Sequence, residues 1–445
     1  MGLVQAALGA VVVLTTSTFN RVMVVELALA AMLPGALVTL HHAMQLFRPR
    51  MGHGSDIGQR RSPWIVYGML ALALGGLGAA VSIAVMGKSM MLGLALAMVS
   101  YVLIGGGVSA CGTSLLVLMA KRVAAPRRAA AATLVWMMMI ASFAVTATVV
   151  GKLLDPFSAL RMVAVTAAVC VVAMLVTLAA MWRLEGGESG RQFPLQTPRQ
   201  AEMSWEIARD RTAFRDALRQ VWAEPDARRF TLFVFVSMLA YSAQDLILEP
   251  FAGAVYGWTP GESTQLAGSQ HGGVFAGMLL VAVVTSVFKD TPLASLKGWV
   301  LGGCLGSAVM MLGLVYAGLS GGGSWPLEQN VFLLGLANGV FSIAAIASMM
   351  TLASQGRGSR EGTRMGLWGA AQAIAFGAGG FLGTVLVDFA QSVAAPGSGV
   401  PYAFVFALEA LGFTAAVWLA RKTTFSQHRA ARPSAIDRSY LAEPV

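Results

Sequence analysis

The chain has 445 residues, of which 56% are apolar and 12% charged, and its formal net charge is +10. Soluble domains carry roughly 25% charged residues, so this composition excludes an ordinary soluble protein. The basic excess does not indicate a nucleic-acid partner, because no soluble domain is available to present a basic face. Cys111, Cys170 and Cys304 lie far apart in apolar runs, which favours buried packing residues over a metal site or disulfides.

Apolar runs of about twenty residues recur along nearly the whole chain, and each is long enough to cross a bilayer as a helix. Polar and apolar residues do not alternate in them, as they would in barrel strands. The first run starts at Leu3 and continues as a full span, without the cleavage site of a signal peptide. We predict an all-α polytopic membrane protein with twelve transmembrane helices, at residues 3–27, 28–47, 64–86, 90–119, 131–151, 159–182, 230–249, 265–287, 298–318, 329–353, 366–387 and 401–420.

The basic residues support this count because they gather in alternate loops. With a cytoplasmic N-terminus, the inner loops and the C-terminal tail contain all of the 31 Lys and Arg residues except Arg21, Lys88, Lys152 and Arg161. Positive charge marks the cytoplasmic side of a membrane protein. We therefore predict a bacterial inner-membrane protein with both termini in the cytoplasm.

The longest polar stretch divides the predicted spans into two sets of six. Its first part is rich in glycine and proline, as expected of a flexible linker. We predict a six-helix half at 1–182, a cytoplasmic linker at 183–229, a second six-helix half at 230–420 and a cytoplasmic tail at 421–445.

The second part of the linker has the pattern of an amphipathic helix. One helical face carries apolar residues and the others carry arginines, which could meet anionic lipid at the cytoplasmic membrane surface. A solvated linker helix and a docking surface for a partner are the alternatives. The apolar residues are Ile207, Phe214, Leu218 and Val221.

The loop after the second span carries a glycine, an acid four residues later and a paired basic end. These residues are Gly52, Asp56, Arg60 and Arg61. The pattern resembles the loop between spans 2 and 3 of the major facilitator superfamily, which implies that fold and a charge latch that switches between two domain arrangements. A generic basic inner loop is the alternative.

The first predicted span of each half ends with polar residues followed by a glutamate. Charged groups inside membrane spans are costly and usually functional. Halves of such transporters are related by a repeat axis, so the two glutamates could occupy equivalent positions near the outer leaflet. The residues are Asn20, Arg21 and Glu26 in the first half, and Gln244, Asp245 and Glu249 in the second.

These acidic residues differ in whether a basic residue lies near them in the sequence. Arg21 is the expected local partner of Glu26, which would make that pair structural. Asp245 and Glu249 have no obvious basic partner nearby, and a functional role or helix-end capping are both open. Glu409 is isolated in the middle of the last span, where a protonated and hydrogen-bonded state is expected.

Histidines occur in the second span of each half. His41 and His42 lie close to Gln45, and His271 lies in the second half. Neutral imidazole can be an axial ligand for the metal of a tetrapyrrole or a proton carrier. A hydrogen-bonded packing residue is the more ordinary alternative. These four residues are therefore candidate pigment ligands.

No motif in the sequence indicates catalysis. The chain has no phosphate-binding glycine loop followed by Lys and Ser or Thr, which argues against ATP-driven transport. No nucleophile–base arrangement stands out, and the glycine runs at 105–107 and 377–380 lie in apolar segments typical of close helix packing. We predict that the protein is not an enzyme.

Three segments resemble a specific family. The runs at residues 14–27, 244–250 and 360–369 are similar to those of the PucC/LhaA family, a branch of the major facilitator fold in purple photosynthetic bacteria. The resemblance covers essentially the whole chain. It implies a light-harvesting assembly factor of the photosynthetic membrane that receives bacteriochlorophyll near its synthase and passes it to antenna polypeptides.

The resemblance implies bacteriochlorophyll as cargo, with bacteriochlorophyll synthase and antenna polypeptides as partners. A pigment with a large apolar ring, an isoprenoid tail and a five-coordinate magnesium needs a carrier with apolar grooves and a weak axial ligand. Two alternatives remain: a proton-coupled permease of a hydrophobic or tetrapyrrole-like molecule, and a structural scaffold of the photosynthetic complex. The permease should have a polar central cavity, and the scaffold should remain in the mature complex.

Overall fold

The computed structural model describes residues 1–45, 62–124, 127–182, 219–288, 291–355, 361–395 and 397–423. Regular structure within these residues is helical. The first half contains α1 (Gly2–Thr16), α2 (Thr18–Arg21), the π-helix η1 (Val22–Glu26), α3 (Met32–Met44), α5 (Ser62–Met86), α6 (Met90–Arg122), α7 (Arg128–Leu154) and α8 (Ala159–Met181). The second half contains α11 (Pro225–Tyr256), α12 (Pro260–Val287), the short 3₁₀ helix η4 (Pro292–Ala294), α13 (Leu296–Leu319), α14 (Leu327–Gln355), α15 (Glu361–Gln391) and α16 (Val400–Lys422).

The helices confirm the predicted fold class. Among the described residues, eleven segments are long and apolar enough to cross a membrane, with residues 2–26 as the first of them. The remaining predicted span is α3, of which 13 residues are described. The chain is thus an all-α, multi-pass membrane protein.

Local sequence signals determine several helix ends. Thr259 and Glu262 form a capping box at the start of α12, in which each side chain accepts from the backbone N–H of the other residue. Gly257 ends α11 with a φ of 69°, a left-handed conformation that costs little in glycine. These signals produce the tight connection between α11 and α12.

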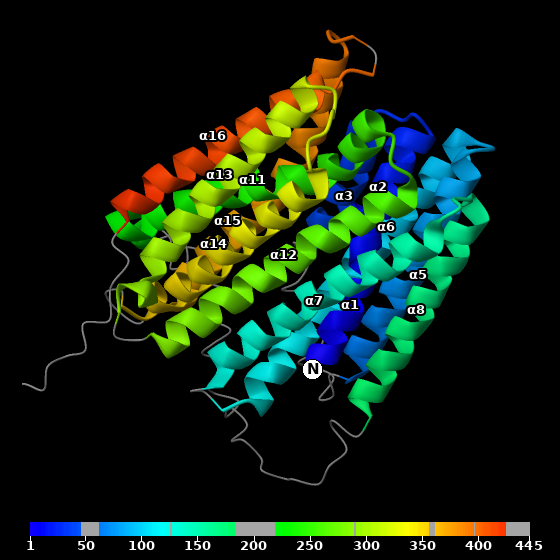
Figure 1. Cartoon of the computed structure of the whole chain (residues 1–445). Coiled ribbons are helices and arrows are strands. Elements are labelled where there is room, and N and C mark those ends of the chain that lie inside the picture. The colour runs from blue at the N-terminus through cyan, green and yellow to red at the C-terminus, as the bar shows by residue number, and fades with distance from the viewer. Residues whose placement is uncertain are drawn as a thin grey trace, which may run out of the picture.

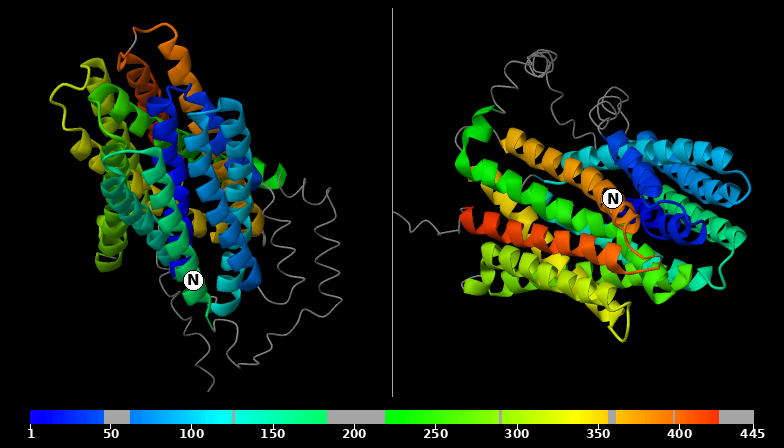
Figure 2. Two further views of the ribbon diagram at one scale, coloured as in Figure 1. Left: turned by 90° about the vertical axis from the view of Figure 1, so that its right-hand side faces the viewer. Right: turned by 90° about the horizontal axis from the view of Figure 1, so that it is seen from above.

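The two halves have separate apolar cores and lie side by side (Figures 1 and 2). One core lies within residues 4–181, with Leu246 and Ala267 added from the other half. The second core lies within residues 230–420. A third cluster joins α7 to α12 and α14 across the interface, and it includes Met139 and Ile140 of the first half and Val274 and Met278 of the second.

The helix bundle has an outer end and an inner end. The outer end carries the connections η1–α3, α7–α8 and α11–α12, and it is the end predicted to face the periplasm. The inner end carries Met1, and Figure 1 marks the N-terminus there. Helices α3 and α15 also pack together across the interface, as α7 and α12 do.

The first predicted span is not one continuous α-helix, contrary to expectation. α1 stops at Thr16, Ser17 adopts a non-helical conformation, and the chain then continues through α2 and the π-helix η1. The hydroxyl groups of Thr15 and Thr16 donate to the carbonyls of Val12 and Val13, 2.7 and 3.4 Å away. Such local bonds compete with the helix ladder, which accounts for the break within this threonine- and serine-rich run.

The seventh predicted span also differs, because α11 continues past Pro250 to Tyr256. Asp245 and Glu249 therefore lie inside the helix and not at its end, which rules out helix-end capping. Proline usually breaks a helix because it lacks an N–H and crowds the carbonyl four residues earlier. Here that carbonyl belongs to Leu246, and it accepts a hydrogen bond from the other half of the molecule.

Candidate functional site

Hydrogen bonds join the halves at mid-depth and toward the outer end in the described part of the chain. We call this set of contacts the outer seam. It brings together α2 with α12, α3 with α15, and α7 with the start of α12. The contacts include Thr18 Oγ1 to Thr264 Oγ1 at 3.1 Å, Thr39 Oγ1 to the Gly377 carbonyl at 3.3 Å, and Thr259 Oγ1 to Asp155 Oδ2 at 2.8 Å, and Asn20, Arg21 and Asp388 add others.

Asn20 supplies the hydrogen-bond donor that Pro250 lacks. Its Nδ2 donates to the Leu246 carbonyl at 2.6 Å, and both residues are buried. Because Pro250 follows Leu246 by four residues, the helix has no N–H to give to that carbonyl. The polar residue predicted at the end of the first span thus completes a helix of the second half.

Arg21 makes two hydrogen bonds, of which one crosses the outer seam. Its Nη1 donates to Glu26 Oε1 at 2.9 Å, which shows the predicted pairing, and its Nη2 donates to the Trp258 carbonyl at 2.7 Å. The guanidinium lies against Gly253, where an added Cβ would come within 2.7 Å of Cζ. Arg21 is 2% exposed and Glu26 is 38% exposed. The arginine therefore acts across the halves as well as locally.

Asp388 caps α3 from the other half of the molecule. The N–H groups of Ala31 and Met32 donate to its two carboxylate oxygens at 2.8 and 2.7 Å. A carboxylate at this position satisfies free amides and opposes the positive end of the helix dipole. Sequence reasoning missed this residue because 356 positions separate it from Met32.

Glu249 and Asp245 lie one turn apart on α11, next to the outer seam. Ser17 and Arg21 lie close enough to Glu249 to interact with its carboxyl group, and Gln270 lies beside Asp245. Glu249 is 3% exposed, whereas Asp245 retains some accessible surface. The structure thus gives Glu249 the basic neighbour, Arg21, that its local sequence lacks.

Buried polar atoms without a hydrogen-bond partner among the described residues concentrate in the same region. An unpaired buried polar atom costs about 1–3 kcal/mol, so such a group marks a polar site inside the bundle. Glu409 belongs to it, and lies near enough to Asp245 to interact electrostatically. The atoms are Asn20 Oδ1, Gln244 Oε1 and Nε2, Asp245 Oδ1, Glu249 Oε2, Gln270 Nε2, and Glu409 Oε1 and Oε2.

His41, His42 and Gln45 form a compact group at the inner part of α3. The two imidazole rings stack with centroids 4.6 Å apart. Gln45 Nε2 lies 3.4 Å from Nε2 of His41 and 3.2 Å from Nδ1 of His42. His41 is 1% exposed, whereas His42 keeps accessible surface and faces Gly377 of α15. The group therefore lies where the two halves meet.

His271 lies in a different environment. Its Nδ1 is 2.8 Å from the Ala267 carbonyl on its own helix, and its ring meets the edge of Phe143 at 5.0 Å. His271 therefore lies between α12 and α7. His41 and His42 instead lie on α3, which packs against α6 and α15. The structure does not assemble the histidines of the two halves into one site.

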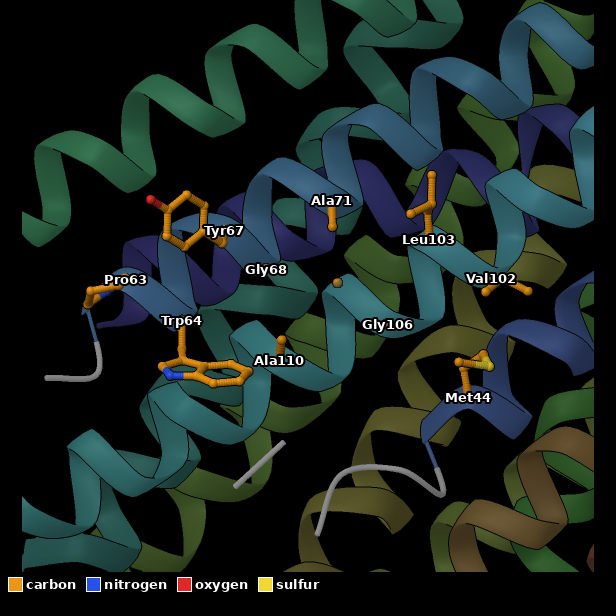
Figure 3. A pocket seen from close by; sticks show the side chains of 11 residues that line it. Met44, Pro63, Trp64, Tyr67, Gly68, Ala71, Val102, Leu103, Gly106 and Ala110 are labelled. Carbon is orange, nitrogen blue, oxygen red and sulfur yellow. The ribbon is translucent and has the colours of Figure 1, made fainter. Parts of the chain in front are cut away.

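An apolar groove with a volume of about 600 Å³ lies between α5 and α6, next to the end of α3 (Figure 3). We call it the α5–α6 groove. It opens on the surface of the bundle, since Tyr67 is 69% exposed and Leu103 is 41% exposed. Its walls include Met44 of α3, Trp64 and Tyr67 of α5, and Val102 and Leu103 of α6. No sequence pattern indicates this groove, because residues from three different helices form it.

Two predicted features lie outside the described residues. They are the loop with Gly52, Asp56, Arg60 and Arg61, and most of the linker at 183–229. Both remain predictions.

The family model described as "PUCC protein" matches residues 18–428 of the chain. The chain is 47% identical over 420 residues to the "Bacteriochlorophyll synthase 44.5 kDa chain" of Rhodobacter capsulatus, covering 94% of this chain and 93% of that protein. It is 29% identical over 440 residues to "Protein PucC" of Cereibacter sphaeroides, covering 92% of this chain and 88% of that protein.

Solved structures of transporters share the fold. A D-xylose-proton symporter superimposes with a TM-score of 0.70 at 15% identity, covering 96% of this chain and 98% of that one. The xylose transporter XylE from E. coli, in an inward-open conformation, gives a TM-score of 0.67 at 13% identity, with 95% of each chain covered. At these identities the likeness shows the fold alone, and that fold agrees with the major facilitator-like fold predicted from the sequence.

Proposed function

Because the chain belongs to the PUCC protein family, we propose that it is a light-harvesting antenna assembly factor that binds bacteriochlorophyll and delivers it to antenna polypeptides. The family match confirms the resemblance seen in the three sequence runs. A relative named as a chain of bacteriochlorophyll synthase supports a link to this pigment. On this proposal the protein carries bacteriochlorophyll, and a separate synthase catalyses its formation.

The observation that carries the proposal is the group formed by His41, His42 and Gln45. The pigment magnesium takes a neutral imidazole nitrogen as an axial ligand. His42 is the first candidate for this role, because it keeps accessible surface while His41 is buried behind it. Gln45 lies within reach of both rings and would orient them. His271 is the candidate in the second half.

The partners and the location follow from the same proposal. The protein would lie in the inner or intracytoplasmic photosynthetic membrane with both termini in the cytoplasm. It would receive pigment from bacteriochlorophyll synthase and contact antenna polypeptides within the lipid bilayer.

Pigment retention tests the proposal directly. Wild type and the variants His41→Ala, His42→Ala and His271→Ala would be purified from a pigment-producing strain, and pigment per protein and its near-infrared spectrum compared. We expect the wild type to carry pigment, and His42→Ala to lower the content and shift the absorption band. A wild type with no more pigment than an unrelated membrane protein would refute direct delivery.

The second candidate is a proton-coupled permease of a hydrophobic or tetrapyrrole-like molecule. The polar site around Asp245, Glu249 and Glu409 favours it, since ionisable groups inside membrane bundles often mark substrate or proton pathways. Flux of such a molecule into proteoliposomes, driven by a pH gradient, would support the permease. A structural scaffold would instead be found in the mature antenna complex at a fixed stoichiometry.

A further inference from the structure

Asp155 and Asp388 each lie at the unfavourable end of their own helix. Asp155 directly follows the last residue of α7, and Asp388 lies in the last turn of α15. The C-terminal end of a helix carries a partial negative charge, so a carboxylate there is locally destabilising. The helix that carries each acid therefore does not explain its presence, and its contacts in the other half of the molecule do.

Both acids interact with the positive end of a helix in the opposite half. The Asp388 carboxylate accepts hydrogen bonds from the N–H groups of Ala31 and Met32 at the start of α3, at 2.8 and 2.7 Å. The Asp155 carboxylate accepts one from the Thr259 hydroxyl at the start of α12, at 2.8 Å. A negative charge is favourable at this end of a helix and strengthens the bonds that it accepts. The favourable interactions of both acids thus depend on contact between the halves at the outer end.

The repeat of the two halves relates the two contacts to each other. Asp155 joins the fifth span of the first half to the second span of the second half, and Asp388 joins the fifth span of the second half to the second span of the first. The second span of each half has a Pro-Gly pair in its first turn, at 34–35 and 260–261. A repeat axis along the membrane normal exchanges contacts of this kind. The chain thus carries the same device twice.

Glycines in these Pro-Gly pairs allow the helices to meet closely. A Cβ added at Gly261 would overlap the Asp155 carboxylate, and one added at Gly35 would overlap the side chain of Thr384, one turn before Asp388. Interfaces packed this closely have two discrete arrangements and do not deform continuously. Each contact is therefore either made or broken.

We propose that Asp155 and Asp388 are paired latches that together hold the outer end of the molecule closed. The halves separate at this end only when both carboxylates leave the helix that they contact. While both latches are closed, the halves shield the polar site around Glu249 from the periplasmic side. This inference is independent of the proposed function, because it concerns the movement of the halves and not the cargo.

Cysteine labelling from the periplasmic side tests this inference in the full chain. Thr264→Cys and Thr384→Cys are the reporters, because both threonines are fully buried where the halves meet, the first near Asp155 and the second near Asp388. Each reporter is combined with Asp155→Ala, with Asp388→Ala and with both. Spheroplasts are then treated with a membrane-impermeant maleimide, and the labelling rate is measured.

Glu328→Ala is the matched control. Glu328 is an exposed acid in the first turn of α14, and it takes part in none of the cross-half hydrogen bonds of the described residues. Its removal takes away the same charge near a helix N-terminus and leaves the contacts between the halves intact. The chain without a reporter gives the background and reports unfolding, because its native cysteines are buried. They are Cys111, Cys170 and Cys304.

We expect either latch substitution to raise the labelling rate of both reporters about tenfold, which corresponds to about 1.4 kcal/mol in the equilibrium for opening. The reporter near the intact latch is decisive. Asp388→Ala should expose Thr264→Cys although Asp388 contacts α3 and not α12, and Asp155→Ala should likewise expose Thr384→Cys. The double substitution should raise the rates about a hundredfold, because separate contacts add in free energy. Glu328→Ala should leave them unchanged.

If each substitution exposes only the reporter near it, the acids stabilise helix ends locally and the latch is overturned. Unchanged rates, or an equal rise in Glu328→Ala, would overturn it as well. Asp155→Asn and Asp388→Asn replace any alanine variant whose native cysteines become labelled. They keep the shape of the side chain and remove its charge, so they should give the same pattern with a smaller rise, and its absence there would also refute the latch.

Discussion

At the scale of single residues, the position of Arg21 depends on a glycine in the other half of the molecule. Gly253→Ala would place a methyl group against the guanidinium and force it away from Glu26 and the Trp258 carbonyl. Overpacking of this kind costs about 1–3 kcal/mol, so we expect a lower thermal unfolding midpoint of the purified protein.

Gly302→Ala is the control for this substitution. Gly302 is exposed on α13, and a Cβ added there would meet no heavy atom within 4 Å. Because alanine is the better helix former, stability should be unchanged or slightly higher. Equal unfolding midpoints for Gly253→Ala and the control would show that Arg21 can move away from the added methyl group without a loss of stability.

The acids of the polar site should differ in importance. Glu249 lies near Ser17 and Arg21 of the first half, whereas Glu409 lies within the second half. We therefore expect Glu249→Gln to impair antenna assembly more than Glu409→Gln does. Complementation of a deletion strain, scored by antenna absorbance at matched protein levels, measures this. Equal or reversed effects would argue against Glu249 as a functional residue.

At the scale of elements, α11 depends on a donor from α2 to compensate for its proline. Removing the donor with Asn20→Ala leaves the buried Leu246 carbonyl unpaired, at a cost of about 1–3 kcal/mol. Pro250→Ala restores an N–H four residues after Leu246, so the helix can satisfy that carbonyl itself.

A double-mutant cycle measures this dependence. Asn20→Ala should cost about 1 kcal/mol less in the Pro250→Ala background than in the wild type, as judged by unfolding free energies. Strictly additive effects would mean that Asn20 does not replace the missing helix donor.

At the scale of the whole molecule, the distribution of basic residues predicts the topology. Reporter fusions after Arg191 and after Gln427 should both give a cytoplasmic signal, because Lys and Arg collect on that side. A periplasmic signal from either fusion would contradict twelve spans with both termini inside.

The sequence could predict the spans because hydropathy is a local property that the bilayer itself requires. It also placed Arg21 and Glu26 together, since five residues of one helix end separate them. It did not show the break at Ser17 inside the first span, and it ended the seventh span too early, at residue 249. Side-chain and cross-half hydrogen bonds override the local preference at both places.

The sequence by itself determined the fold class and the family, since long apolar runs and family-specific runs are each readable within a single segment. Only the tertiary structure decided which polar residues meet. Asn20 reaches Leu246, Asp388 caps α3, and His271 stays apart from the other histidines. These contacts join helices far apart along the chain, and helix packing, which no local pattern encodes, selects them.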